Sequence, residues 1–151
     1  MFSKTCEYGI RASIYICATG SQDYKIGIAE ISENIEAPSH FTAKILQTLV
    51  HTDILSSQKG VNGGFFMTKP QKNRQLIEVV RAIDGDKLFS GCGLGLKYCS
   101  DDEPCPLHDK YKIIRSNLEK MMERTTIDEM AKILKKGRKF IRHDHLIDDD
   151  E

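Results

Sequence analysis

Three cysteines and one histidine in the second half of the chain are the residues best suited to metal chemistry. Cys92 is followed after six residues by Cys99, then after five by Cys105 and after two by His108. Glycines around Cys92 allow the segment to bend, so that the thiolates can converge on one ion. Structural zinc sites use more closely paired cysteines, whereas iron–sulfur clusters accept wide, uneven spacings and a non-thiolate ligand. The spacing favours an iron–sulfur cluster and leaves zinc binding and a structural or thiol-redox role as alternatives.

The other two cysteines are expected to belong to the hydrophobic core. The chain has five cysteines, an odd number that excludes complete pairing, and disulfides are not expected in a cytosolic protein. Cys6 and Cys17 fall within a helical pattern near the N-terminus, in which Ile10, Ile14 and Cys17 share one face. Both are interpreted as small buried apolar side chains.

Length and composition predict a globular protein. With 151 residues, of which 40% are hydrophobic and 29% charged, the chain can form one compact domain or a small domain with an extension. No apolar run approaches the length of a membrane span, and Glu7 and Arg11 interrupt the stretch that a signal peptide would need. We therefore expect a cytoplasmic protein with no membrane partner.

Charge is balanced overall but unevenly distributed. The chain has 22 Lys and Arg against 22 Asp and Glu, yet residues 38–81 contain six basic and two acidic residues. Residues 82–110 contain three basic and six acidic residues. The basic segment fits either an ordinary solvated surface or a nucleic-acid contact, and local pattern must decide between them.

A helix-turn-helix pattern overlaps the start of the basic segment. Apolar residues repeat at helical spacing up to Ala37-Pro38, where the proline ends the first of two short helices. Ser39 is the expected N-cap of the second helix, in which Phe41, Ile45 and Leu49 form the expected core stripe. The opposite stripe is rich in hydrogen-bonding groups and consists of His40, Lys44, Gln47 and His51. Two such helices joined by a tight turn are typical of DNA-binding proteins.

A β-hairpin is predicted directly after these helices. Residues 54–59 and 65–67 read as strands, separated by a glycine-rich turn over residues 60–64. Asn62-Gly63 is expected to supply the positive φ angles of the turn, and Lys59 lies at its start. Beside a helix-turn-helix such a hairpin is a wing, although a purely structural hairpin is the alternative. The glycines lack the spacing of a phosphate-binding loop.

Three further helical patterns complete the chain. One runs from Leu76 to a stop at Gly85, and the last begins at a capping box of Thr126 and Glu129. Between them lies the cysteine-rich segment, expected to be a loop, and then a narrow apolar seam of Tyr111, Ile114, Leu118 and Met121. Such a seam suits pairing with a second helix, either within the core or across a dimer.

These parts, in this order, resemble the Rrf-type winged-helix transcription regulators, the family of the IscR and NsrR iron–sulfur regulators. The similarity covers residues 1 to about 136. Its most specific parts are residues 44–50, residues 59–65, residues 79–85 and the cysteine loop. The first gap between cysteines is one residue longer than in better-known members, and Val61-Asn62 replaces a proline-glycine pair found in many wings.

The resemblance implies a mostly α-helical fold with a small hairpin wing and a long dimerisation helix. It divides the chain into a DNA-binding domain (1–85), a cluster-binding loop (86–108), dimerisation helices (109–136) and a C-terminal tail (137–151). It implies a homodimer that binds double-stranded palindromic operator DNA, acts as a repressor, and carries one two-iron or four-iron cluster per subunit. The cluster ligands would be Cys92, Cys99 and Cys105, with either His108 or Glu7 as the fourth.

The DNA contacts are expected on the second helix and the wing. The residues concerned are Ser39, His40, Lys44, Gln47, Lys59 and Asn62. The rival interpretation is a small iron–sulfur electron-transfer protein, which has no use for a winged helix. An enzyme is not expected, because no local pattern places a base beside a cysteine nucleophile.

Overall fold

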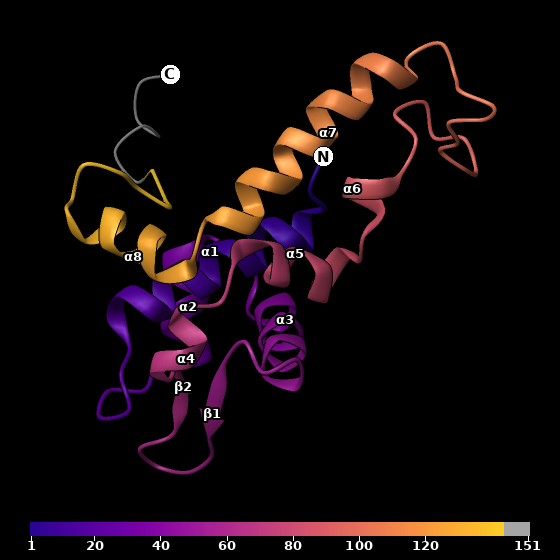
Figure 1. Ribbon diagram of the computed structural model, residues 1–151. Coiled ribbons are helices and arrows are strands. Elements are labelled where there is room, and N and C mark those ends of the chain that lie inside the picture. The colour runs from indigo at the N-terminus through magenta and orange to yellow at the C-terminus, as the bar shows by residue number, and fades with distance from the viewer. Residues whose placement is uncertain (144–151) are drawn as a thin grey trace, which may run out of the picture.

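A computed structural model describes residues 1–143 of the chain, so that only the first part of the expected C-terminal tail falls within it. Its described part contains eight helices and one two-stranded antiparallel sheet (Figure 1). The elements, in chain order, are α1 (Lys4–Thr19), α2 (Ile28–Ile35), α3 (Ser39–His51), β1 (Ser56–Gln58), β2 (Gly64–Phe66), α4 (Lys69–Lys72), α5 (Leu76–Asp84), α6 (Lys87–Ser90), α7 (His108–Arg124) and α8 (Ile127–Lys135). This mostly helical architecture with a hairpin wing confirms the expected fold class. The short helices α4 and α6 were not predicted.

Helices α2 and α3 form the helix-turn-helix. Helix α2 ends where Glu36 adopts the left-handed conformation with φ of 54°, just before Ala37-Pro38. The N-cap of α3 is Pro38, with φ of −61° and extended ψ, and Ser39 is already the first helical residue, so the predicted Ser39 cap is wrong. The pyrrolidine ring of Pro38 fixes the φ angle needed at the start of α3. The helix start has no hydrogen bond from a capping side chain.

The buried face of α3 differs by one position from the predicted stripe. Phe41 is 48% exposed and its ring lies against that of His40, with centroids 4.3 Å apart. Thr42 takes the buried place instead, because Thr42, Ile45 and Leu49 repeat at helical spacing towards the core. Its hydroxyl donates to the Pro38 carbonyl oxygen at 3.1 Å, which satisfies the polar group without water.

The wing is tied to the helices by a third strand-like segment. Ile26 and Phe65 exchange two backbone hydrogen bonds of 2.8 and 2.9 Å. The positive φ angles belong to Gly60 (106°) and Gly64 (147°), so the prediction of positive φ at Asn62-Gly63 is wrong. The connection is longer than a two-residue hairpin turn, and a Cβ on Gly64 would lie 2.7 Å from the Ile26 carbonyl oxygen. Glycine is therefore needed where β2 leaves the turn and meets Ile26.

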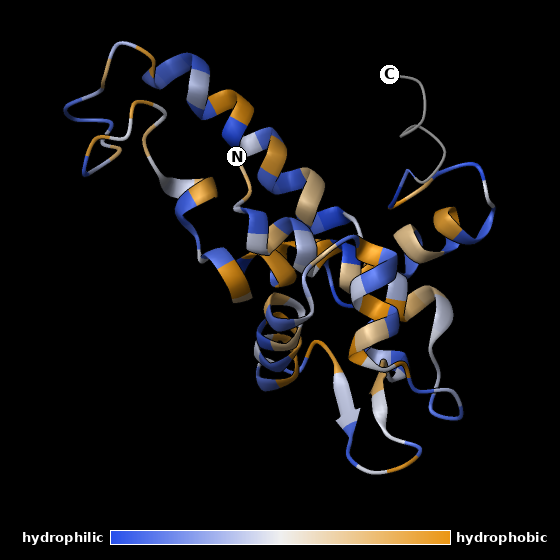
Figure 2. Ribbon diagram, turned by 180° about the vertical axis from the view of Figure 1, so that it is seen from behind, coloured by the Kyte–Doolittle hydropathy of each residue, from blue (hydrophilic) through white to orange (hydrophobic). Residues whose placement is uncertain are grey.

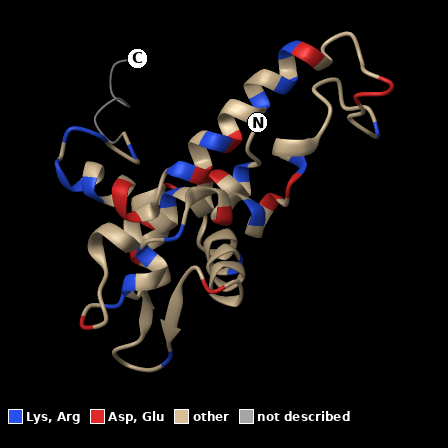
Figure 3. Ribbon diagram, viewed as in Figure 1, with Lys and Arg blue, Asp and Glu red and all other residues tan. Residues whose placement is uncertain are grey.

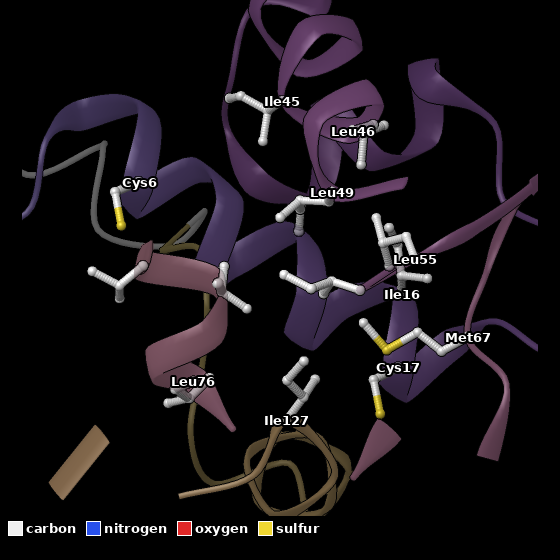
Figure 4. Close-up of a cluster of buried hydrophobic side chains, with 14 of the residues drawn as sticks. Cys6, Ile16, Cys17, Ile45, Leu46, Leu49, Leu55, Met67, Leu76 and Ile127 are labelled. Atoms are coloured by element: carbon white, nitrogen blue, oxygen red, sulfur yellow. The ribbon is translucent and has the colours of Figure 1, made fainter. Parts of the chain in front are cut away.

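The hydrophobic core surrounds α1. Figure 4 shows side chains from α1, α3 and α5 converging with Leu55, Met67 and Ile127. Cys6 and Cys17 are fully or almost fully buried here, which confirms their predicted apolar role. Helix α8 packs along α1 through Ile127 and Ala131, and the Thr126 hydroxyl accepts from the Glu129 backbone N–H at its start.

Helix α7 projects from this core and carries the cysteine-rich segment at its far end (Figure 1). Near its C-terminal end Met122 is buried, whereas its N-terminal half contacts α6 and the cysteine loop. The wing and the cysteine loop lie at opposite ends of the molecule in both Figure 1 and Figure 2. Among residues 1–143, no helix combines the length and apolar character needed to cross a membrane.

Candidate nucleic-acid interface and cysteine loop

One face of α3 and the adjacent wing present exposed polar side chains, with Phe41 and Val61 exposed among them. The predicted contact residues are all exposed: Ser39, His40, Lys44, Gln47, Lys59 and Asn62. His51 is exposed beside them, and a groove of about 450 Å³ between α3 and the wing is lined by Gln47, His51, Lys59 and Phe65 among others. The buried residues of α3 lie on its other side. The surface therefore has the shape expected of a recognition helix with an adjacent wing.

This surface is free of carboxylates. Lys44 is the only Lys, Arg, Asp or Glu in α3, and Lys59 is the only one between residues 54 and 68. Figure 3 shows blue and no red along the hairpin. With no negative charge on either element, the surface can approach a phosphate backbone without like-charge repulsion.

At the opposite end of the molecule, the three cysteines and the histidine form two pairs. The sulfur atoms of Cys92 and Cys105 are 3.7 Å apart, and the Cys99 sulfur lies 3.4 Å from Nδ1 of His108. All three thiols are free and half-buried. Among the described residues, no three His, Cys, Asp or Glu side chains are close enough to form a metal site. The donor types suit a soft metal, but the two pairs would have to move together to share one.

His108 is buried and has partners at both ring nitrogens. It is the first residue of α7, with 6% of its surface exposed. Nε2 lies 2.8 Å from Oδ1 of Asp101, and the same carboxylate oxygen accepts from the Lys112 ammonium at 2.6 Å. The Lys112 hydrogen bond, with that of His108 second, holds the pKa of Asp101 below its usual value.

Arg115 attaches the cysteine loop to the next turn of α7. Its guanidinium donates to the Gly91 carbonyl oxygen at 2.5 Å and to the Cys99 sulfur at 3.2 Å. The Gly93 backbone lies directly on the Tyr111 ring, where an added Cβ would be 2.7 Å from the ring. Sequence reasoning missed Asp101, Lys112 and Arg115 as parts of this site. The helical spacing of His108, Lys112 and Arg115, four and then three residues, would have placed them on one face.

The loop thiol at Cys92 differs electrostatically from the buried cysteines. Backbone N–H groups of Leu94 and Leu96 donate to the Cys92 sulfur and lower the pKa of this thiol. In contrast, burial raises the pKa of Cys6 to about 12 and that of Cys17 to about 11. The thiolate form that binds metal is therefore favoured at Cys92 and disfavoured at Cys6 and Cys17.

The alternative ligand, Glu7, lies on α1 and pairs with Lys4. Its carboxylate is 3.4 Å from the Lys4 ammonium, one turn earlier on the same helix. The Glu7 side chain is 45% exposed and can be approached from outside the chain.

Helix α7 leaves Ile113, Ile114 and Met121 as an exposed apolar row, whereas Tyr111 packs on Gly93 and Leu118 packs against the core, so the predicted seam is only partly uncovered. Ile113, Ile114 and Met121 are 64%, 61% and 54% exposed, and Tyr111 and Leu118 are half-buried. Figure 2 shows hydrophobic segments alternating with hydrophilic ones along the projecting helix. Such a row is unusual on a helix that has only water beside it.

Comparison with known proteins places the chain in a family. A family model described as Rrf2, iron-dependent transcriptional regulator, matches residues 2–133. The chain belongs to the Rrf2 family. It is therefore a transcriptional regulator with a winged-helix DNA-binding fold, as the sequence resemblance predicted. The named relatives are transcriptional regulators, a class of proteins that are generally not enzymes.

Individual transcriptional regulators match over most of the chain. A protein of Aquifex aeolicus named as an HTH-type transcriptional regulator is 26% identical over 138 residues, covering 90% of this chain and 94% of its own. The transcriptional regulator NsrR of Oceanobacillus iheyensis is 22% identical over 130 residues, covering 85% of this chain and 88% of its own.

Solved structures agree in fold. CymR, the global cysteine regulator of B. subtilis, superposes with a TM-score of 0.72 and 16% identity over 88% of this chain and 97% of its own. IscR of T. potens superposes with a TM-score of 0.68 and 14% identity over 92% of this chain and 91% of its own. At these identities the likeness shows the winged-helix fold alone.

Proposed function

We propose that this Rrf2-family chain is a homodimeric repressor whose affinity for a palindromic operator depends on an iron–sulfur cluster. The observation that carries the proposal is the loop with three free, half-buried thiols, one of which, Cys99, lies beside the buried His108. Three thiolates and one imidazole are a suitable donor set for iron–sulfur chemistry. In this proposal residues 1–85 bind DNA, residues 86–108 hold the cluster, residues 109–136 dimerise, and residues 137–151 form a tail.

The DNA contacts divide into base readout and backbone contacts. On α3, His40, Lys44 and Gln47 would face the major groove, where the Gln47 amide can pair with an adenine edge. Ser39 at the helix start and Lys59 and Asn62 on the wing would contact phosphates or the adjacent minor groove. Their common exposure on a surface without carboxylates supports this arrangement.

The apolar row on α7 supports a dimer. Ile114 and Met121 are more than half exposed in the single chain and would be covered by a second α7. A two-fold pair of recognition helices then requires two half-sites of opposite orientation, which is a palindrome.

The route from the loop to the recognition helix would run through α5. Arg81 on α5 donates to Asp86 at 2.6 Å and to Glu119 of α7 at 3.1 Å, so it joins α5 to both sides of the loop. Farther in, Ile83 of α5 and Ile45 of α3 both pack against Gly9, where no side chain separates them from α1. Movement of the loop relative to α7 would therefore change the packing of α3 through directly contacting elements.

Residues of the loop and of α1 offer two ligand sets. When bound, the cluster would supply a centre that responds to redox state, nitric oxide or iron–sulfur supply. Cys92, Cys99 and Cys105 would hold it, with His108 as the fourth ligand of a two-iron cluster from the same loop. Glu7 would instead have to leave its ion pair with Lys4 and reach a four-iron cluster in a second subunit. The burial of His108 beside Cys99 favours the histidine.

A thiol-based regulator is the second candidate, favoured by the 3.7 Å between the Cys92 and Cys105 sulfur atoms. Oxidation of both thiols by one molecule of peroxide would give a disulfide and two molecules of water. To form this disulfide, the two sulfur atoms need to approach by only about 1.7 Å, to the usual S–S bond length near 2 Å.

Anaerobic purification tests the two candidates. We expect a brown chain with iron and sulfide bound, and loss of the chromophore when any one of Cys92, Cys99 and Cys105 is changed to Ser. Selection of bound DNA duplexes should then recover a palindromic site. Gln47→Ala should discriminate less between base pairs at this site, with a loss of about 1–3 kcal/mol in binding free energy. A colourless, metal-free chain whose DNA affinity changes with peroxide would establish the thiol mechanism, and a zinc-loaded chain would refute both.

A further inference from the structure

We propose that Asp101 is a positioning residue that holds His108 in its Nε2–H form, so that Nδ1 is the atom offered to the metal. The proposal rests on the cluster function above, with His108 as its fourth ligand, and adds to it the atom that binds and the residue that selects this atom. Asp101 itself would not touch the metal.

The hydrogen-bond geometry determines which nitrogen carries the proton. Oδ1 of Asp101 lies 2.8 Å from Nε2 of His108 and also accepts from the Lys112 ammonium at 2.6 Å. An ionised carboxylate can only accept hydrogen bonds, so Nε2 must donate. A neutral imidazole has one N–H, and Nδ1 is left with a lone pair. That lone pair lies 3.4 Å from the sulfur of Cys99, one of the proposed ligands.

The opposite tautomer would be penalised by the same contacts. With the proton on Nδ1, the lone pair of Nε2 would face the Asp101 carboxylate at hydrogen-bond distance, and both groups would be acceptors. The His108 side chain is only 5% exposed, so water has little access to relieve this contact. Burial of the ring therefore turns an ordinary surface hydrogen bond into a selection between tautomers.

The carboxylate is itself fixed by α7. Asp101 is 73% exposed and lies on the loop, but Lys112 anchors it from the helix turn that follows His108. Since Asp101 is two residues after Cys99, the same contact also limits where that thiol can lie. Carboxylate partners of metal-bound histidines act in this way in many metalloproteins, and their removal typically weakens metal binding about 10- to 100-fold.

The tautomer can be measured on the full-length chain without metal. Long-range ¹H–¹⁵N correlation spectra of histidine-labelled protein at pH 8, with the signals assigned by His108→Gln, should show protonated Nε2 and unprotonated Nδ1. Asp101→Ala should move both shifts towards the average of exchanging tautomers. Asp102→Ala is the matched control, because it removes a neighbouring exposed carboxylate that makes no described contact with His108. Protonated Nδ1 in the wild type, or unchanged shifts in Asp101→Ala, would overturn the proposal.

The ligand atom is tested on the cluster-loaded chain. Pulsed electron paramagnetic resonance of the reduced protein should show strong coupling to a nitrogen that changes when histidine is labelled at Nδ1 alone. Asp101→Ala should lose its cluster to a chelator about 10- to 100-fold faster, and Asp102→Ala within about twofold of wild type. Equal effects of the two variants would show that Asp101 acts only through its negative charge and would refute its positioning role. Strong coupling to Nε2 would also refute the proposal.

The two levels of failure are separable. A coloured chain without strong nitrogen coupling refutes His108 as a ligand and leaves the cluster function intact with Glu7 as its fourth ligand. A colourless chain refutes the cluster function, and with it the role of Nδ1 in binding, even where the spectra of the metal-free chain give the expected tautomer.

Discussion

The five cysteines should separate into two classes of chemical reactivity in the metal-free chain. Burial raises the pKa of Cys6 to about 12, with the nearby Asp84 charge adding to the effect, and raises that of Cys17 to about 11. At pH 8 about one Cys6 in 10⁴ and about one Cys17 in 10³ is a thiolate. A thiol of ordinary pKa near 8.5 is about one quarter ionised at this pH. Backbone N–H groups lower the pKa of Cys92 from its usual value, which favours the thiolate at this position.

These fractions predict alkylation rates that differ by more than about 100-fold. The reagent must also reach the sulfur, and Cys6 and Cys17 are 0% and 2% exposed, which widens the difference. Reduced protein treated anaerobically with iodoacetamide at pH 8 and sampled by mass spectrometry should stop at three adducts, on Cys92, Cys99 and Cys105. The same protein in guanidinium should take up five adducts at similar rates. Modification of Cys6 or Cys17 as fast as Cys99 in the folded chain would refute the assignment of core and loop thiols.

Three further substitutions test the interfaces and the wing. Ile114→Lys should sediment as a monomer without a lower unfolding temperature, whereas Lys120→Glu, outside the apolar row, should leave the dimer unchanged. A wild-type chain that sediments as a monomer would contradict the dimer. Gly64→Ala should destabilise the chain by at least about 1 kcal/mol, because the new Cβ meets the Ile26 backbone at a φ of 147°, and thermal unfolding at an unchanged temperature would show that this contact is absent. Lys59→Ala should weaken binding to all DNA sequences and reduce the salt slope by about one per lost phosphate contact, which titrations at several salt concentrations can check.

The DNA-binding half of the fold could be predicted because its elements are defined by local patterns. Spacing of apolar residues placed α2 and α3 with nearly correct ends, since Pro38 separates the two helices at a fixed position. The same reasoning failed for Phe41, because Phe41 and Thr42 both fit helical spacing with Ile45 and Leu49, and only the packing of the folded chain buries Thr42. It failed again at the wing turn, where contact with Ile26, distant in sequence, decides which glycine needs a positive φ.

The cysteine loop shows where prediction from sequence ends for the candidate site. The types and spacing of Cys92, Cys99, Cys105 and His108 pointed to a soft-metal donor set, because ligand chemistry depends on residue type. How these donors pair depends on the path of a glycine-rich loop, and no periodicity encodes such a path. The helix that follows does have a period, and it places His108, Lys112 and Arg115 on one face against the loop. The partners that orient the ligands are therefore found more readily on the regular element beside the loop than within the loop itself, because a helix fixes side-chain directions that a loop leaves open.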